Sequence, residues 1–188
     1  MAEPVRILGI CGSLRKASYN RFALRAAREL APPDVTLEEA FLHGLPGFDQ
    51  DREQSPPPEV VELKSRVRAA DAILFVTPEY NYSVPGVLKN AIDWASRPYG
   101  DSAWQGKPVA VMGASIGAFG TARAQAHLRQ SFVFLDMPVL QQPEVLIANA
   151  ADRFDADGRL TDEGTRRRVA SLVAALADWT RRLRASAR

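Results

Sequence analysis

Short apolar runs alternate with longer stretches of helical periodicity along this chain. Such alternation is typical of βαβ units, in which helices connect parallel strands. The predicted strands are Val5–Cys11, Val35–Phe41, Ala72–Thr77, Pro108–Gly113 and one strand within Val139–Ile147. The predicted helices follow Ser18, begin near Pro58, span about Val84–Ser96 and Thr121–Leu135, and end with a C-terminal helix that buries Val169, Leu172, Val173, Leu176 and Trp179. We therefore expect a single α/β domain over residues 1–188.

The connections between the strands predict their order in the sheet. Because βαβ crossovers are right-handed, a parallel sheet of order 2-1-3-4-5 with helices on both faces is favoured. That arrangement is a three-layer α/β sandwich of the flavodoxin type. The stretch Leu42–Pro58 is rich in Pro, Gly and Asp without periodicity, so we expect a long loop there, of a length that is usually functional or flexible.

Composition and charge narrow the function classes. The chain of 188 residues is 46% hydrophobic and 24% charged, and its formal net charge of +2 is too small to indicate nucleic-acid binding. No apolar run approaches the roughly 20 residues of a membrane span, and the N-terminal residues do not resemble a secretory signal. The single cysteine excludes an internal disulfide and fits a reducing compartment. We expect a cytoplasmic protein that binds neither membranes nor nucleic acid.

A polar loop, GSLRKASYN at Gly12–Asn20, follows the first predicted strand and leads into a helix. Free backbone amides and the helix dipole at such a position attract an anion. The loop adds polar and cationic side chains that suit a phosphate, namely Ser13, Arg15, Ser18 and Asn20. An ordinary helix cap is the alternative interpretation, because serine and asparagine are also the commonest residues at helix starts.

A second polar loop, PEYNYSVPG at Pro78–Gly86, follows the third predicted strand. It combines a carboxylate, an amide and two tyrosines, which suit the edge and face of a flat heteroaromatic ring. Tyr80 and Tyr82 could instead be plain turn or interface residues. In open parallel sheets, ligands bind outside the carboxyl ends of the strands where the strand order reverses. The two loops together therefore predict a mononucleotide site.

With these two loops and the segment GASIGAFGTARAQAHLRQ at 113–130, the chain resembles the NADPH-dependent FMN reductases. The resemblance is to the branch that includes quinone and chromate reductases, and it extends over nearly the whole chain. Its central motif, VTPEYNYSVPGVLKNAIDWASRP, is long and specific. The resemblance implies FMN as cofactor and NADPH or NADH as co-substrate, with the chemistry carried by FMN rather than by a catalytic side chain.

The resemblance also assigns the flavin contacts to particular residues. It implies that the phosphate is held by Ser13, Leu14, Arg15, Ser18 and Asn20, with Leu14 contributing its backbone. It further implies that the isoalloxazine is lined by Pro78, Glu79, Tyr80 and Asn81, and that Ser115 approaches the ring or the ribityl chain. Glu79 is expected to position its loop rather than to move protons.

A homodimer or homotetramer with flavins near the subunit boundary is a further implication of the resemblance. His127, Arg129 and Glu144 are then expected at the interface rather than in catalysis. Ala126 stands where some relatives carry a tyrosine, so a tyrosine-mediated contact between dimers is not expected.

Three other chemistries have partial motifs in the chain. Gly113–Gly117 matches the GxSxG elbow of α/β-hydrolases, but neither His43 nor His127 occupies the late position that their triad requires. We attribute these glycines to close approach of the backbone to a ligand. Asp155–Gly158 resembles part of a calcium loop but lacks its first and last acidic ligands, so no metal site is predicted. Cys11 ends an apolar strand, which favours a buried structural cysteine over a phosphatase nucleophile.

We therefore expect an FMN-dependent oxidoreductase that passes electrons from NAD(P)H to a small acceptor, a quinone or else chromate or an azo compound. The alternative is an FMN-binding electron carrier or redox sensor that acts with a protein partner. Such carriers tend to be acidic, whereas this chain is slightly basic. A purely structural interaction domain is a third interpretation, and it would require a protein that ignores FMN.

Overall fold

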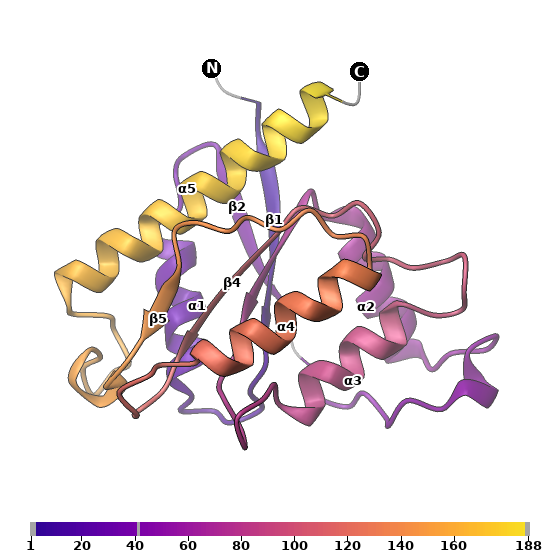
Figure 1. Cartoon of the computed structure of the whole chain (residues 1–188), viewed down its shortest axis with the longest axis horizontal. Helices are drawn as coiled ribbons and strands as arrows, with labels where there is room; N and C mark the ends of the chain where they lie inside the picture. Colours follow the sequence, from indigo (N-terminus) through magenta and orange to yellow (C-terminus); the bar gives the residue numbers. More distant parts are fainter. Residues whose placement is uncertain (1–2, 41, 187–188) are drawn as a thin grey trace.

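The computed structural model describes residues 3–40 and 42–186, and the predicted α/β architecture is confirmed (Figure 1). Five parallel strands lie in the order β2-β1-β3-β4-β5. They are β1 (Val5–Cys11), β2 (Val35–Ala40), β3 (Ala72–Val76), β4 (Val109–Ala114) and β5 (Val145–Ile147). The helices are α1 (Tyr19–Glu29), α2 (Pro58–Ala69), α3 (Gly86–Ala95), α4 (Ala122–Phe134) and α5 (Glu163–Ser186), with short 3-10 turns η1 (Gln50–Arg52) and η2 (Ala150–Asp152).

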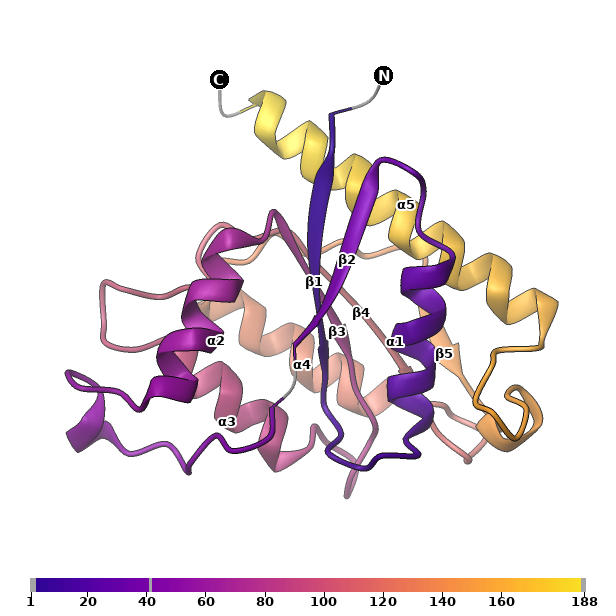
Figure 2. The same cartoon turned by 180° about the vertical axis from the view of Figure 1, so that it is seen from behind.

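The sheet separates two hydrophobic cores. Figures 1 and 2 show the helices around the sheet from opposite sides. Alternate residues of a strand point to opposite faces of its sheet. Accordingly, Leu74 of β3 packs with α1 and α5, whereas Ile73 and Phe75 pack with α2, α3 and α4. Every residue of β3 is buried, which explains why its sequence is apolar throughout instead of alternating.

Several element boundaries differ slightly from the predicted ones. Helix α3 begins at Gly86 rather than Val84, because Pro85 precedes it as an N-cap with extended backbone angles. Strand β2 is described up to Ala40, and Phe41, its predicted last residue, lies outside the described residues.

The C-terminal part of the chain shows two larger differences. Of the predicted fifth strand region only Val145–Ile147 forms a strand, while Val139 makes one isolated bridge to Val109. Trp179, predicted to be in the core, is half-buried, and its indole Nε1 donates to the carbonyl of Pro138 at 3.4 Å. A polar ring nitrogen of this kind favours a place where one side of the ring remains wet.

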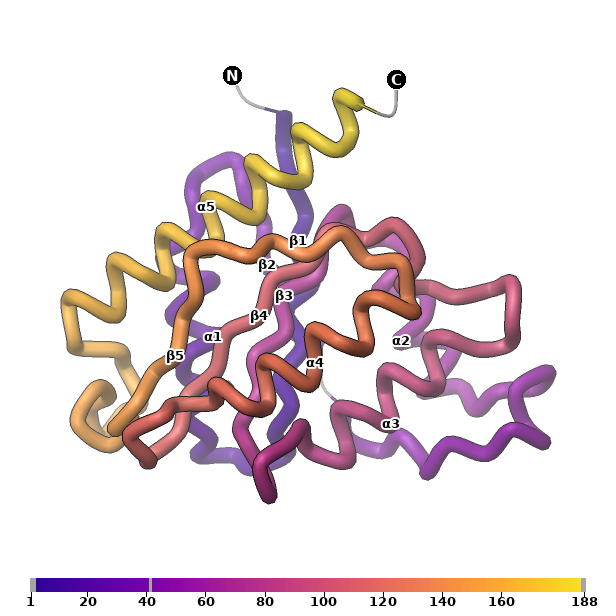
Figure 3. Tube along the Cα trace, viewed as in Figure 1, coloured from indigo at the N-terminus to yellow at the C-terminus, as the bar shows by residue number. Residues whose placement is uncertain are grey.

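The strand register determines where the loops emerge. Cys11 pairs with Val76, and Val76 pairs with Met112, so β1, β3 and β4 end at nearly the same level. Their following loops therefore leave the same edge of the sheet, which is the lower edge in Figure 3.

The opposite edge of the sheet holds both described ends of the chain. There the Nε of Arg181 donates to the carbonyl of Glu3 at 2.9 Å, and Arg184 pairs with the Glu3 carboxylate at 3.6 Å. Among the described residues, no helix combines the length and the apolar character that crossing a bilayer requires.

Candidate functional site

The loop between β1 and α1 is organised by two serine hydroxyls. Ser18 is the N-cap of α1 and its Oγ accepts the N–H of Asn20 at 3.2 Å. The Oγ of Ser13 accepts the N–H of Arg15 at 3.3 Å in the same way. Both serines are buried, and a hydroxyl that accepts a hydrogen bond still has its own hydrogen to donate. The loop before α1 therefore has two hydroxyl groups that can still donate.

Positive charge gathers at the same loop. Arg15 and Lys16 are exposed, Arg21 lies in the first turn of α1, and no acidic residue occupies that turn. Among the described residues, Arg15 has no ion-pair partner. The N-terminal end of the helix dipole adds a partial positive charge. An anion is consequently the ligand that this end of the sheet favours electrostatically.

Asn20 joins the loop to the neighbouring strand β4. Its side chain is 3% exposed, its Nδ2 donates to the carbonyl of Ala114 at 2.8 Å and its Oδ1 accepts the N–H of Ala114 at 2.8 Å. Because these bonds occupy the amide oxygen and one amide hydrogen, one N–H remains for a ligand. Asn20 thus positions the loop as well as contributing a donor.

Leu14 and Gly12 fix the position of this loop relative to its surroundings. The Leu14 side chain is 42% exposed, and its carbonyl oxygen lies 3.1 Å from Nε2 of His43. The N–H of Gly12 donates to the carbonyl of Val76 at 2.9 Å. A Cβ at Gly12 would lie 3.3 Å from the Cδ of Pro78. The loop after β1 therefore adjoins the loop after β3.

The loop after β3 is a tight hairpin. Tyr80 and Ser83 exchange backbone hydrogen bonds of 3.0 and 2.9 Å, and Asn81 and Tyr82 at the tip have φ angles of 50° and 66°. Positive φ at both central residues is the geometry of a type I′ turn, which asparagine tolerates better than tyrosine does. Tyr80 is 51% exposed and Tyr82 is 67% exposed. Backbone strain of this kind is found mostly at functional sites.

Glu79 fastens the hairpin to α4. Its side chain is 6% exposed, and its carboxylate accepts the backbone N–H groups of Arg123 and Ala124 at 3.0 and 3.2 Å. The carboxylate also pairs with the Arg123 guanidinium. Glu79 thereby caps α4, because the N-cap residue Thr121 makes no side-chain capping bond.

The protonation of Glu79 follows from these contacts. Burial acts to raise the pKa of Glu79, but the hydrogen bonds from Arg123 and Ala124 together outweigh it, so this pKa lies below its usual value. The group is therefore ionised at neutral pH and holds a fixed position.

The loop after β4 forms the third wall of the site. The N–H of Ser115 donates to the carbonyl of Ile147 at 3.0 Å, and its Oγ accepts the N–H of Gly117 at 3.2 Å. A Cβ at Gly113 would lie 2.2 Å from both the carbonyl oxygen of Thr77 and the Oγ1 of Thr121. Our explanation of Gly113 by close approach to a ligand was therefore wrong, because the backbone there approaches the protein's own threonines.

The competing chemistries lack the geometry that they need. The Nδ1 of His127 lies 3.0 Å from the Oγ of Ser83, so this histidine contacts the hairpin rather than Ser115. Burial raises the pKa of Cys11 to about 11, which keeps its thiol neutral and unsuited to nucleophilic attack. Asp155 accepts the N–H groups of Asp157 and Arg159 and thus closes a turn. The described residues contain no group of three or more metal-ligating side chains.

Sequence reasoning missed Arg123. Its guanidinium carbon lies 3.7 Å from the centre of the Tyr82 ring and 5.3 Å from that of the Phe119 ring. Because it also pairs with Glu79, this arginine joins the loops after β3 and β4. The available signal in the sequence was the pair of opposite charges, Glu79 in the loop after β3 and Arg123 in the first turn of α4.

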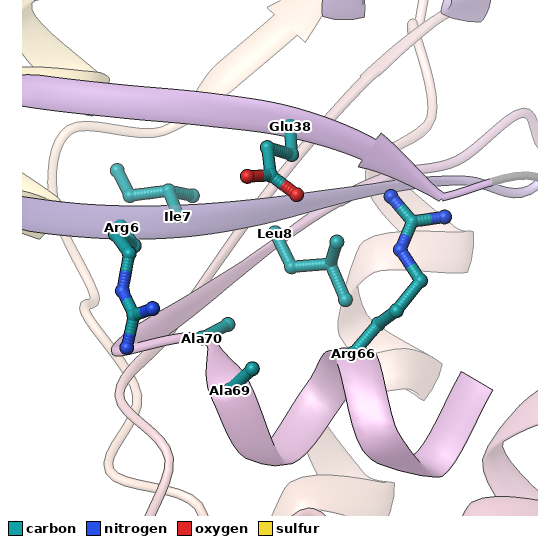
Figure 4. A pocket seen from close by; sticks show the side chains of 7 residues that line it. All are labelled: Arg6, Ile7, Leu8, Glu38, Arg66, Ala69 and Ala70. Atoms are coloured by element: carbon teal, nitrogen blue, oxygen red, sulfur yellow. The ribbon is translucent and has the colours of Figure 1, made fainter. Parts of the chain in front are cut away.

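A cavity outside these loops is shown in Figure 4. It lies between α2 and the strands β1 and β2, near Arg6, Glu38 and Arg66, and its volume is about 90 Å³. Small-molecule pockets usually enclose roughly 300–1,000 Å³. The cavity is therefore too small to compete with the loops as a nucleotide site.

Comparison with known proteins shows that the chain belongs to the NADPH-dependent FMN reductase family, whose sequence pattern matches residues 5–152. A Pseudomonas aeruginosa protein named NAD(P)H-dependent FMN reductase is 52% identical over 185 residues, which cover 98% of this chain and 100% of the relative. A quinone reductase of Pseudomonas putida is 48% identical over 186 residues, with coverage of 98% and 100%. The solved structure of the flavoenzyme NAD(P)H:(acceptor) oxidoreductase FerB from Paracoccus denitrificans has a TM-score of 0.88 at 39% identity, covering 95% of this chain and 98% of that one.

These findings confirm the predicted family and the flavodoxin-like fold. They also confirm the predicted enzyme class, that of NAD(P)H-dependent FMN and quinone reductases. Membership of this family implies FMN and NAD(P)H as the redox pair.

Proposed function

We propose that this chain binds FMN between the loops after β1 and β3 and reduces a quinone at the expense of NAD(P)H. The main support for the proposal is that these two loops adjoin at Gly12. The loop after β1 contains cations and leads into a helix N-terminus, and the loop after β3 contains exposed tyrosines. Bound FMN would supply the hydride chemistry, while the protein supplies binding, orientation and electrostatics.

The donor set at the first loop suits a dianionic phosphate. The Arg15 guanidinium can form two parallel hydrogen bonds to phosphate oxygens, and the hydroxyls of Ser13 and Ser18 can donate to others. The proposed phosphate contacts are Ser13, the backbone of Leu14, Arg15, Ser18 and Asn20. The absence of an acid from the first turn of α1 removes the repulsion that would oppose them.

The hairpin and the loop after β4 suit a flat ring. Tyr80 and Asn81 are exposed at the hairpin, whereas Pro78 is buried beneath it. The proposed ring contacts are Pro78, Tyr80 and Asn81, the backbone at Glu79, and Ser115 beside them. No side chain is assigned as an obligatory acid or base, because Glu79, the carboxylate at the hairpin, is held in an ion pair with Arg123.

A quinone is the acceptor that the relatives support. One relative is named quinone reductase, and a Burkholderia protein that is 44% identical over 177 residues is named 2-hydroxy-1,4-benzoquinone reductase. Chromate and azo compounds are secondary candidates. The proposal covers residues 1–188 as one FMN-binding domain in a cytoplasmic protein.

A homodimer or homotetramer is also part of the proposal, with His127, Arg129 and Glu144 near the contact. Helix α4 supports it, because Val133 and Phe134 are 83% and 74% exposed. Sedimentation velocity tests this point, and a monomer at micromolar concentration would contradict it.

The central experiment is a visible spectrum of the purified protein, followed by anaerobic titration with NADPH and with NADH. We expect a yellow protein whose flavin band bleaches on titration and recovers when a quinone is added. A colourless protein that does not take up added FMN would overturn the proposal. In stopped-flow experiments, sluggish reduction that accelerates only with a protein partner would favour the electron-carrier alternative.

A further inference from the structure

Arg123, in the first turn of α4, contacts two residues of the hairpin. Its guanidinium pairs with Glu79 at the base of the hairpin and lies 3.7 Å from the centre of the Tyr82 ring at the tip. The Phe119 ring, 5.3 Å away, is on the loop after β4. A planar guanidinium can pair with a carboxylate and stack on an aromatic ring at the same time, which a lysine ammonium cannot do.

The hairpin tip needs such external support. Tyr82 has a φ of 66°, a left-handed conformation that tyrosine rarely adopts. Strained backbone persists only where surrounding contacts overdetermine it. The stack of Arg123 on Tyr82 supplies one such contact. Asn81 tolerates its own positive φ, but this does not relieve the strain at Tyr82.

A second contact joins the hairpin to the same face of α4. His127 lies one helical turn after Arg123, and its Nδ1 is 3.0 Å from the Oγ of Ser83. Residues four apart on a helix share a face. Helix α4 therefore holds the base and tip of the hairpin through Arg123 and its returning side through His127.

We propose that Arg123 is a positioning residue for flavin binding. It holds Tyr80 and Asn81 in the conformation that receives the isoalloxazine and does not itself touch the ring. The inference rests on the proposed function, because it needs FMN to bind beside this hairpin. It goes beyond that function by assigning a role to a residue outside both binding loops.

The test compares Arg123→Met and Arg123→Lys with Arg153→Met in the full-length protein. Arg153 is a matched control, because its side chain is also 38% exposed and pairs with Asp162 at 2.8 Å. The measurements are the FMN dissociation constant, the visible circular dichroism of bound FMN, and hydrogen exchange of the Tyr80 and Ser83 amides in the FMN-free protein. The visible circular dichroism of bound FMN reports the environment of its ring. A general loss of protein stability does not change this signal while FMN stays bound.

We expect Arg123→Met to raise the FMN dissociation constant about tenfold, because part of the binding free energy would then be needed to order the hairpin. Its flavin circular dichroism should change, and both hairpin amides should exchange faster. Arg123→Lys should recover part of the affinity, since it restores the charge without the stacking. Arg153→Met should stay within about twofold of the wild type, as expected for an exposed ion pair.

Two results would overturn the inference. One is an Arg123→Met protein with wild-type affinity, dichroism and exchange, and the other is an equal change in Arg153→Met. If Arg123→Met does not fold, Arg123→Lys decides alone, and wild-type values in all three measurements would count against the proposal. A wild-type protein that binds no FMN would reject the proposed function instead, and exchange at Tyr80 and Ser83 would then still test whether Arg123 holds the hairpin.

Discussion

The loops after β1 and β3 adjoin, yet they use charge in opposite ways. In the loop Gly12–Asn20 the cation Arg15 is exposed and, among the described residues, unpaired. In the loop Pro78–Gly86 the charge of Glu79 is buried and neutralised by Arg123. The first loop keeps its charge available for a ligand, while the second uses its charge to hold a strained conformation. Exposure and partners, rather than residue type, therefore distinguish an arginine that binds from one that positions.

The largest expected effect concerns Asn20, which ties the first loop to β4. Asn20→Ala would leave the buried N–H and carbonyl of Ala114 without partners, at about 2–5 kcal/mol of unfolding free energy in total. Urea titration measures this loss. Gln130→Ala, at an exposed position on α4, is the control and should change the unfolding free energy by less than about 0.5 kcal/mol. A loss below about 1 kcal/mol for Asn20→Ala would mean that the amide is not structural.

The next effect contrasts the charges of the two loops directly. Arg15→Ala should raise the FMN dissociation constant by about 10–100-fold, because a hydrogen bond to a charged group contributes about 1.5–3 kcal/mol. Glu79→Ala should raise it less, since Glu79 acts through the hairpin. Fluorescence titration measures both variants, with Arg28→Ala at the far end of α1 as control. Equal dissociation constants for Arg15→Ala and Glu79→Ala would contradict the assignment of Arg15 to the phosphate.

A smaller effect is the pH dependence of the second loop. Because the pKa of Glu79 is lower in the folded protein than in the unfolded chain, its contribution is complete above the unfolded value of about 4.5. That contribution disappears as the pH falls through the folded pKa. The difference in unfolding free energy between wild type and Glu79→Gln should therefore be greatest near about pH 6–7 and shrink below about pH 4. A constant difference across this range would show that the ion pair does not stabilise the fold.

The smallest expected effect concerns the contact between Ser83 and His127. Ser83→Ala removes one exposed hydrogen bond, so the unfolding free energy should fall by no more than about 1 kcal/mol. FMN affinity should change by less than about threefold, because Arg123 still holds the base and tip of the hairpin. An effect on FMN binding as large as that of Arg123→Met would shift the positioning role to His127.

Local features of the fold were predictable from the sequence. The unbroken apolar run of β3 indicated a strand covered on both faces, and Ser18 marked the start of α1. Their signals lie within a few neighbouring residues. The placement of both loops at one edge followed from the parallel order of the strands.

Contacts between distant residues were not predictable in the same way. Glu79 and Arg123 are 44 residues apart, and their pairing depends on how α4 packs beside the hairpin. Gly113 was misinterpreted for a related reason, because the atoms that exclude a Cβ there belong to Thr77 and Thr121. One sequence places a glycine at this position but does not show which neighbour would exclude a side chain there.

The contacts of Arg181 and Arg184 with Glu3 have a practical consequence. They hold both described ends of the chain together at the edge of the sheet remote from the loops (Figure 1). A reporter domain or an electrode linker attached at either end would leave the loops facing solution. Immobilised protein should therefore remain accessible to soluble electron donors and acceptors.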